Sequence, residues 1–332
     1  MKNVSLLTIT VIICLLIMEL LLRVAGYQPL QLKPNRFFVD NSETTWSVPD
    51  KDIGWLNKPG LSISIEEGNA PMTFWSHGRR ASRKYDKFDN YSLNIMLSGG
   101  SNAQSYGVED EKTFAFLLGN SLPGVRVDNF GTGGFGTVQS YMLAKRTLEH
   151  FYINQKPDLI ILSISDSHFN RNVSDFSWMR NISDKNGYYV SPPHYRLSYG
   201  EVEFHPFKVI KPWVFETSSS MLTLLHFLVN KHVSYSTSSY SNEITFFALN
   251  KFKEMASENQ SDFLVLILED YSGKSEFLLK SSGINYLNCS GFEKTNPELY
   301  LLGGGSHPND KFHQYYAECL ETWLRDNYRI TN

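Results

Sequence analysis

The chain has 332 residues, of which 42% are hydrophobic and 20% are charged, and its formal net charge is -3. This is the composition of a globular protein with enough apolar material for one large core. No run of basic residues is present, so nucleic acid is set aside as a partner. We expect no metal site, because the following histidines show no ligand spacing and are typical of surface or packing residues: His194, His205, His226, His232 and His313.

The N-terminus carries a nearly continuous apolar stretch, Val4 to Leu22, between Lys2 and Arg23. Its length is close to the roughly 20 residues that span a bilayer, and Glu19 and Arg23 are spaced to pair on one helix face. No convincing small-residue cleavage site precedes Gly26, which favours a retained anchor at 1–25 over a removed signal peptide or a buried core helix. The flanking charges place the N-terminus inside. We therefore expect a single-pass anchor in the inner (cytoplasmic) membrane, with the remaining chain facing the periplasm or the exterior.

Residues 26–90 are rich in proline, asparagine, serine and aromatic residues and show no sustained period. Residues 52–60 read as turns, and 61–65 as a short alternating strand. We expect this segment to wrap the main domain instead of forming a domain of its own.

From residue 94 onward, apolar runs typical of strands alternate with helical patterns. Strands are predicted at 94–98, 125–129, 158–164, 263–268 and 284–287, and helices at 113–122, 138–151, 244–258 and 310–328. This alternation predicts an α/β fold at 91–330: a five-stranded, mostly parallel sheet in a three-layer sandwich. The strand at 158–164 has the apolar interior Leu159 to Leu162, which favours a central position.

Two parts of the chain leave alternatives open. Between about 172 and 242 the alternation is lost, apart from a short helix expected at 221–229. Such an insertion is either a lid or binding region or a variable surface excursion. Of the three cysteines, Cys14 lies in the apolar N-terminus, while Cys289 and Cys319 are able to pair, although free or buried thiols are the expectation.

Three loops follow successive predicted strands and so share the carboxyl edge of the sheet, where ligands bind. They hold Ser101 after two glycines, the glycine loop 131–136, and residues 163–172. His307 opens the C-terminal helix and is expected at the same edge. A serine becomes a nucleophile when a histidine takes its proton, and the backbone N–H groups of Ser101 and Gly134 are candidate oxyanion donors. The glycine loop lacks the residues of a phosphate or dinucleotide loop, so no cofactor is expected.

These blocks resemble the SGNH (GDSL-like) hydrolase superfamily, in the form of its membrane-anchored bacterial members. The first block is similar to Leu97 to Asn102, the second to Asn129 to Gly134, and the last to Gly304 to Asn309. The leader from Glu19 to Gly26 also looks like the anchors of such proteins. The resemblance implies a flavodoxin-like fold, with Ser101 as nucleophile and His307 as base.

Two positions depart from the family pattern. Ser167 stands where the family has an asparagine that donates to the oxyanion, with Asn170 and Asn172 further along the loop. Gly304 stands where the family has the aspartate that orients the histidine. The site is then a serine–histidine dyad, or it takes an acid from elsewhere, for which Asp166, Asp310 and Glu298 are the candidates.

The resemblance implies a membrane-anchored serine esterase or O-acyltransferase that acts on acyl esters, such as O-acetyl groups of a cell-envelope polysaccharide. One alternative is a catalytically degraded scaffold that binds an envelope glycan or an assembly partner. Another is a lipid esterase whose anchor, residues 4–22, holds the site near the bilayer.

Overall fold

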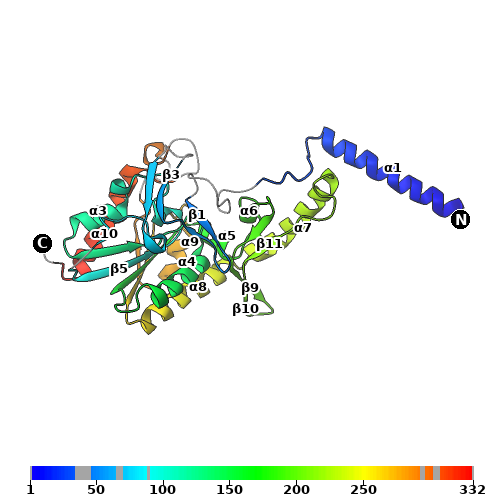
Figure 1. Cartoon of the computed structure of the whole chain (residues 1–332). Coiled ribbons are helices and arrows are strands. Elements are labelled where there is room, and N and C mark those ends of the chain that lie inside the picture. Colours follow the sequence, from blue (N-terminus) through cyan, green and yellow to red (C-terminus); the bar gives the residue numbers. More distant parts are fainter. Residues whose placement is uncertain are drawn as a thin grey trace.

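The computed structural model describes residues 2–33, 46–64, 70–87, 90–291, 296–301 and 307–330. Its first element is the helix α1 (Lys2–Val24), which projects from the body of the molecule (Figure 1). The stretch Val4–Val24 has a mean hydropathy of 2.7 and no buried residues, so it is long and apolar enough to cross a membrane. A signal sequence has the same character. The predicted N-terminal apolar helix is therefore present.

The core of the molecule is a five-stranded sheet with the order β13-β12-β7-β5-β6. Every neighbouring pair in it is parallel, as predicted. The strands are β5 (Leu93–Ser98), β6 (Val125–Asn129), β7 (Leu159–Ile164), β12 (Asp262–Ile267) and β13 (Tyr286–Asn288). If the five strands are numbered 1 to 5 along the chain and read from the β6 edge, their order is 2-1-3-4-5, the strand order of flavodoxin-like folds. The fully buried β7 lies at the centre, which confirms the prediction from its apolar sequence.

Helices cover both faces of the sheet, because alternate strand residues point to opposite sides. Ile160 and Leu162 of β7 belong to the core with α4 (Thr137–His150) and α8 (Ser241–Glu258), on the side that also takes α9 (Lys274–Lys280). Leu159 and Ile161 belong to the core with α3 (Phe114–Ser121) and α10 (Asp310–Asn327). The predicted three-layer sandwich is confirmed. Short helices, α2 (Ser101–Gln104) and α5 (Ser167–Asn172), begin just beyond β5 and β7.

The segment before the sheet forms two antiparallel hairpins. They are β1 (Ser47–Asp50) with β2 (Gly54–Asn57), and β3 (Gly60–Ser64) with β4 (Ala70–Phe74). A turn of 3-10 helix follows at Ser76–Gly78, and another, Asp110–Lys112, lies between α2 and α3. Trp55, Met72 and Phe74 are buried in the same core as α4. The apolar side chains of the segment before the sheet thus fill part of the core of the sheet domain.

The insertion after β7 holds more regular structure than its sequence pattern indicates. It contains α6 (Phe176–Met179) and two antiparallel pairs: β8 (Tyr189–Ser191) with β11 (Lys208–Ile210), and β9 (His194–Ser198) with β10 (Glu201–His205). It ends in α7 (Ser220–Ser238), which extends the helix expected at 221–229 in both directions. Figure 1 shows α7 beside the end of α1.

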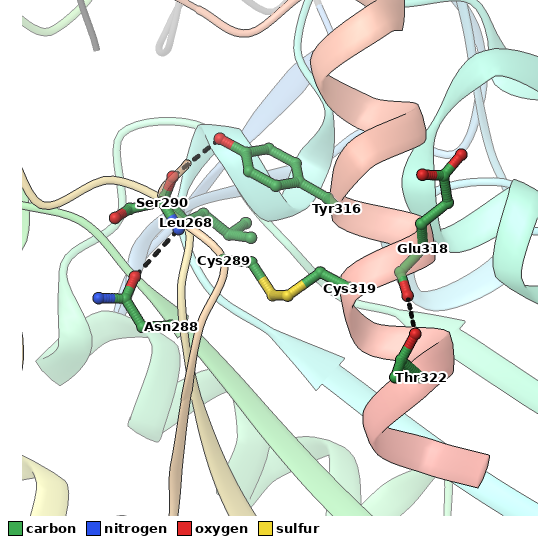
Figure 2. The surroundings of a disulfide bond; sticks show 8 residues. All are labelled: Leu268, Asn288, Cys289, Ser290, Tyr316, Glu318, Cys319 and Thr322. Carbon is green, nitrogen blue, oxygen red and sulfur yellow. Dashed lines mark hydrogen bonds between the residues drawn. A yellow bond between two sulfur atoms is a disulfide. The ribbon is translucent and has the colours of Figure 1, made fainter. Parts of the chain in front are cut away.

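A disulfide joins Cys289 to Cys319, so the expectation of free thiols was wrong (Figure 2). Cys289 directly follows the edge strand β13, and Cys319 lies on α10, which packs over that edge. Their Cα atoms are 6.1 Å apart although 30 residues separate them in the chain. The Tyr316 hydroxyl donates to the carbonyl of Leu268 at 2.8 Å beside the bridge. The pairing depends on the packing of α10, which residue spacing alone does not encode. A last 3-10 turn, Pro297–Leu299, lies within the closed segment.

Candidate active site

The sheet topology places a site between β5 and β7. The chain leaves β5 toward β6 on one side and leaves β7 toward β12 on the other, so the connections diverge there. Such a switch point opens a crevice at the carboxyl ends of the strands. Ser101 begins α2 just after β5, and Ser165 to Ser167 follow β7.

Two glycines allow the end of β5 to approach its neighbours closely. Gly99 has a φ of +151°, and a Cβ atom on it would lie 2.3 Å from the Ser163 hydroxyl of β7. A Cβ atom on Gly100 would lie 3.0 Å from His168 Nε2 and 3.5 Å from Arg171 Nη1. Glycine is therefore needed at 99, where both φ and space exclude a side chain, while at 100 a Cβ atom would press on the loop after β7.

The structure brings Ser101 and His307 together. Ser101 Oγ lies 2.9 Å from His307 Nε2, across 206 residues of sequence, and both residues are half-buried. The imidazole packs against Tyr106, with the ring centroids 5.3 Å apart. The backbone carbonyl of His307 accepts a hydrogen bond from Leu301 N at 2.9 Å, which fixes the segment just before α10. A histidine nitrogen at this distance from a serine hydroxyl has the geometry of a general base and its nucleophile.

A carboxylate that the sequence analysis missed, Glu269, lies in the same cluster. It follows β12, and the side chain of Asn102, the neighbour of Ser101, hydrogen-bonds to it. The Tyr271 hydroxyl donates to Glu269 Oε1 at 3.3 Å. Burial raises the pKa of Glu269, while these hydrogen bonds and the charges of His307 and Arg171 act in the opposite direction. A half-buried carboxylate close enough to feel the charge of His307 is suited to stabilise a protonated imidazole.

The three acids proposed from sequence have other partners. Asp166 accepts hydrogen bonds from Ser272, from its N–H at 2.9 Å and its hydroxyl at 3.0 Å, and burial raises its pKa. Asp310 starts α10, where its carboxylate accepts from Lys311 N at 3.0 Å. Glu298 lies 3.8 Å from the Lys311 amine, with its side chain 76% exposed. Gly304, where the family aspartate would stand, lies outside the described residues.

The glycine loop 131–136 packs against the turn that holds Ser101. Thr132 N donates to Gly99 O at 3.0 Å, and Asn129 links the two loops by donating to Ala103 O at 2.7 Å and accepting from Gly131 N at 2.8 Å. Gly134, the predicted oxyanion donor, has a φ of +82° within the turn that Phe135 N closes onto Thr132 O. The second block thus forms one wall beside Ser101.

Residues from the N-terminal hairpins hold this loop from behind. The Trp55 indole donates to Gly133 O at 2.8 Å, and the Asn57 amide donates to Gly131 O at 2.9 Å. Gln104 of α2 donates to Asn57 Oδ1 at 2.7 Å. Sequence patterns gave no signal for these contacts, because they join turns that are more than 40 residues apart.

Arg80 fixes the other end of α2. Its guanidinium donates to Gln104 O at 3.2 Å and Val108 O at 2.6 Å, and it forms an ion pair with Asp110. Burial lowers its pKa to about 9, so the side chain stays charged at neutral pH. A cation bonded to two carbonyls just beyond Ser101 restrains the short helix that carries this residue.

The third predicted oxyanion donor, Ser167, begins α5 with its hydroxyl 2.9 Å from that of Ser165. Asn172 is engaged elsewhere, since its side chain accepts from Val138 N at 3.1 Å and donates to the Thr245 hydroxyl at 2.9 Å. Asn170 is exposed.

Two side chains of α5 lie beside Gly100, the buried His168 and the half-buried Arg171. Arg171 donates to Phe135 O at 3.0 Å and stacks over Trp178. Burial lowers the pKa of Arg171 to about 10 and that of His168 to about 3. At neutral pH this wall therefore combines a guanidinium cation with a neutral imidazole, which the Thr137 hydroxyl contacts at 3.2 Å.

Comparison with solved structures finds similar chains among esterases. A lipolytic protein of the G-D-S-L family from Desulfitobacterium hafniense aligns at 12% identity and a TM-score of 0.39, over 70% of this chain and 99% of its own. A psychrotrophic esterase from a Pseudoalteromonas species aligns at 11% identity and a TM-score of 0.40, over 71% and 100%. A family two carbohydrate esterase from Clostridium thermocellum aligns at 10% identity and 0.40, over 74% and 66%. No family model and no curated protein matches the sequence.

Proposed function

We propose that this chain is a membrane-anchored serine esterase or O-acyltransferase of the SGNH type, with Ser101 as nucleophile, His307 as general base and Glu269 as the acid that orients and stabilises His307. The observation that supports this most directly is the 2.9 Å contact between Ser101 Oγ and His307 Nε2 at the switch point of the sheet. Glu269 supplies the negative charge that the sequence lacks at Gly304.

The proposed reaction is acyl transfer in two halves. Ser101 Oγ attacks the ester carbonyl carbon while His307 Nε2 takes the hydroxyl proton. The tetrahedral intermediate collapses, the C–O bond to the leaving alcohol breaks, and His307 returns the proton to that oxygen. Water or a second hydroxyl then attacks the acyl-enzyme, again losing its proton to His307. The bond between the acyl carbon and Ser101 Oγ breaks, and His307 returns the proton to Oγ, which restores the free serine. Water gives hydrolysis, and another hydroxyl gives transfer.

The oxyanion of each intermediate needs preorganised donors. We assign the backbone N–H groups of Ser101 and Gly134 to this role, with the Ser167 hydroxyl in the place of the family asparagine. The half-buried Arg171 cation beside Gly100 adds positive potential on the same wall. A neutral His168 next to it does not compete as a second cation.

The substrate we propose is an O-acetyl or similar acyl ester of a cell-envelope polysaccharide. Two features favour a site outside the cytoplasm. The α1 helix is long and apolar enough to anchor the domain in the inner membrane, and the Cys289–Cys319 disulfide is of the kind that persists in oxidising compartments.

Serine-directed labelling tests the assignment. Folded wild-type protein is expected to react with a fluorophosphonate probe and to release acetate from a model acetyl ester, whereas Ser101→Ala should lose both activities. Ser281→Ala, an exposed serine just after α9, is the matched control and should behave as wild type.

The other outcomes separate the remaining functions. A folded wild-type protein that takes up no label contradicts the enzyme and favours a scaffold that binds an envelope glycan. Activity confined to long-chain esters favours a lipid esterase. Acetylation of an added glycan acceptor, measured by mass spectrometry, identifies the transferase.

A further inference from the structure

An exposed apolar surface lies next to the end of α1. It consists of the turn before α7 and one face of that helix, and we call it the α7 surface: Trp213, Val214, Phe215, Leu225, Leu228 and Val229. Val214 is 76% exposed, Phe215 72% and Leu228 51%. Contiguous apolar exposure of this kind marks an interaction site, because soluble proteins expose such side chains singly.

The α7 surface is held in place by contacts with the rest of the fold. Leu225, Leu228 and Val229 have the spacing of one helix face. Next to this face, His226 is buried, with Nδ1 2.9 Å from the Glu216 carboxylate and its ring stacked on Trp213 at 4.4 Å.

The turn before the helix is equally fixed. Glu216 also accepts from Trp213 N at 2.8 Å. Phe215 has a φ of +65°, which is strained for a bulky residue, yet its ring points outward. The fold thus holds a strained turn that presents an aromatic ring to the surroundings.

The end of α1 is bonded to the start of α7. The Glu19 carboxylate accepts from Ser219 Oγ at 2.9 Å, Ser220 N at 2.8 Å and Met221 N at 3.0 Å, so it caps α7 as an N-cap side chain would. Arg23 pairs with Glu19 at 2.8 Å and donates to Ser218 O at 2.7 Å. The Glu19 carboxylate, near the end of the apolar helix α1, therefore finds its hydrogen-bond donors at the start of α7 in the insertion.

These contacts set the depth of α7. The apolar stretch Val4–Val24 has 21 residues and spans about 31 Å at 1.5 Å per residue, which matches the roughly 30 Å hydrocarbon core of a bilayer. Glu19 lies five residues before Val24, about 7.5 Å along the helix axis. The capped start of α7 then lies about 7.5 Å below the edge of the hydrocarbon core, within the roughly 5–10 Å depth at which the apolar face of an interfacial helix is buried.

We propose that the α7 surface lies in the boundary between acyl chains and headgroups, so that the domain rests on the bilayer in a fixed orientation instead of swinging on α1. The charges agree with a lipid partner. Within 211–232 the one acidic residue, Glu216, is buried, while Lys211 and Lys231 are exposed on either side of the apolar residues. This is the pattern of an interfacial helix that meets anionic headgroups. The proposal does not depend on the esterase assignment.

A fluorophore at position 228 tests the proposal in the full chain. Leu228→Cys is made in a Cys14→Ser background, labelled with nitrobenzoxadiazole, and reconstituted in vesicles of phosphatidylethanolamine and phosphatidylglycerol. The matched control is Ile153→Cys, an apolar residue that is 66% exposed in the connection leading to the amino end of β7. We expect blue-shifted emission at 228, quenching by lipids with a nitroxide near the headgroup, and protection from aqueous cobalt. The label at 153 should show the reverse.

Two results overturn the proposal. If aqueous cobalt quenches both labels equally, the α7 surface faces water. If the label at 228 is protected from cobalt but unaffected by the nitroxide lipids, protein covers the surface, as a second copy or another partner would. Both readouts are independent of enzymatic activity, so an inactive protein still gives a decisive result.

Discussion

Removing the disulfide is expected to destabilise the domain by an amount that follows from the loop it closes. The perturbation is Cys289→Ala together with Cys319→Ala, which opens a segment whose ends are 30 residues apart. The loop-closure expression gives about 3.7 kcal/mol for a loop of this length. That is a large fraction of the roughly 5–15 kcal/mol by which domains are stable. The same segment contains His307, so part of the site is held by this bridge.

The assay is equilibrium unfolding in urea, with and without a reducing agent. The oxidised wild type should unfold at a higher urea concentration than the double variant, by about 3–4 kcal/mol after extrapolation to water. A reducing agent should lower the stability of the wild type and leave the variant unchanged. Cys14→Ala, which removes the exposed free thiol of α1, is the control and should have no effect. Equal stability of wild type and double variant would refute the reasoning, as would an equal effect of the reductant on both.

Two further predictions concern the charges of Glu269 and His313. Glu269→Gln should lower kcat by about 10²–10⁴-fold, because an amide cannot stabilise the imidazolium of His307, and Glu269→Asp should recover part of the loss. The pH–rate profile should change shape in Glu269→Gln, and a profile that keeps its shape and height argues against the acid role. Burial lowers the pKa of His313 to about 3, so the unfolded chain binds a proton there below about pH 6.5 and the folded chain does not. Stability is therefore lost as the pH falls, by about 2 kcal/mol at about pH 5 from this group. His313→Gln should flatten the fall between about pH 7 and 5 in urea unfolding, and an unchanged slope would show that other groups cause it.

The sheet was predictable because buried parallel strands read as continuous apolar runs between helical patterns. For the same reason the chain order alone placed Ser101 and the loop after β7 at one edge. The insertion was not predictable in this way. Its strands β8 to β11 have three to five residues each, and β9 and β10 have mixed exposure, so they leave no clean period in the sequence.

Contacts between distant segments could not be predicted from the sequence, for a different reason. The bonds from Trp55 and Asn57 to the glycine loop join residues more than 70 positions apart, as does the capping of α7 by Glu19. Each is a polar group meeting a backbone atom, and such pairs carry no composition signal. The Glu19–Arg23 pairing was predictable because it is local, whereas its role at α7 required the fold.

In the site that we propose, the acid near His307 comes from a different chain position than in the family pattern. What a histidine base needs is a negative charge near its ring, and several loops at the carboxyl edge of a parallel sheet reach the same point. In the family pattern the aspartate comes from the segment just before the histidine, which here is glycine at 304. Glu269 instead approaches from the end of β12, and Asn102 ties it to the residue next to Ser101. A search for an acid at this edge, one strand at a time, would have found it, because Glu269 directly follows the apolar run that predicted the fourth strand.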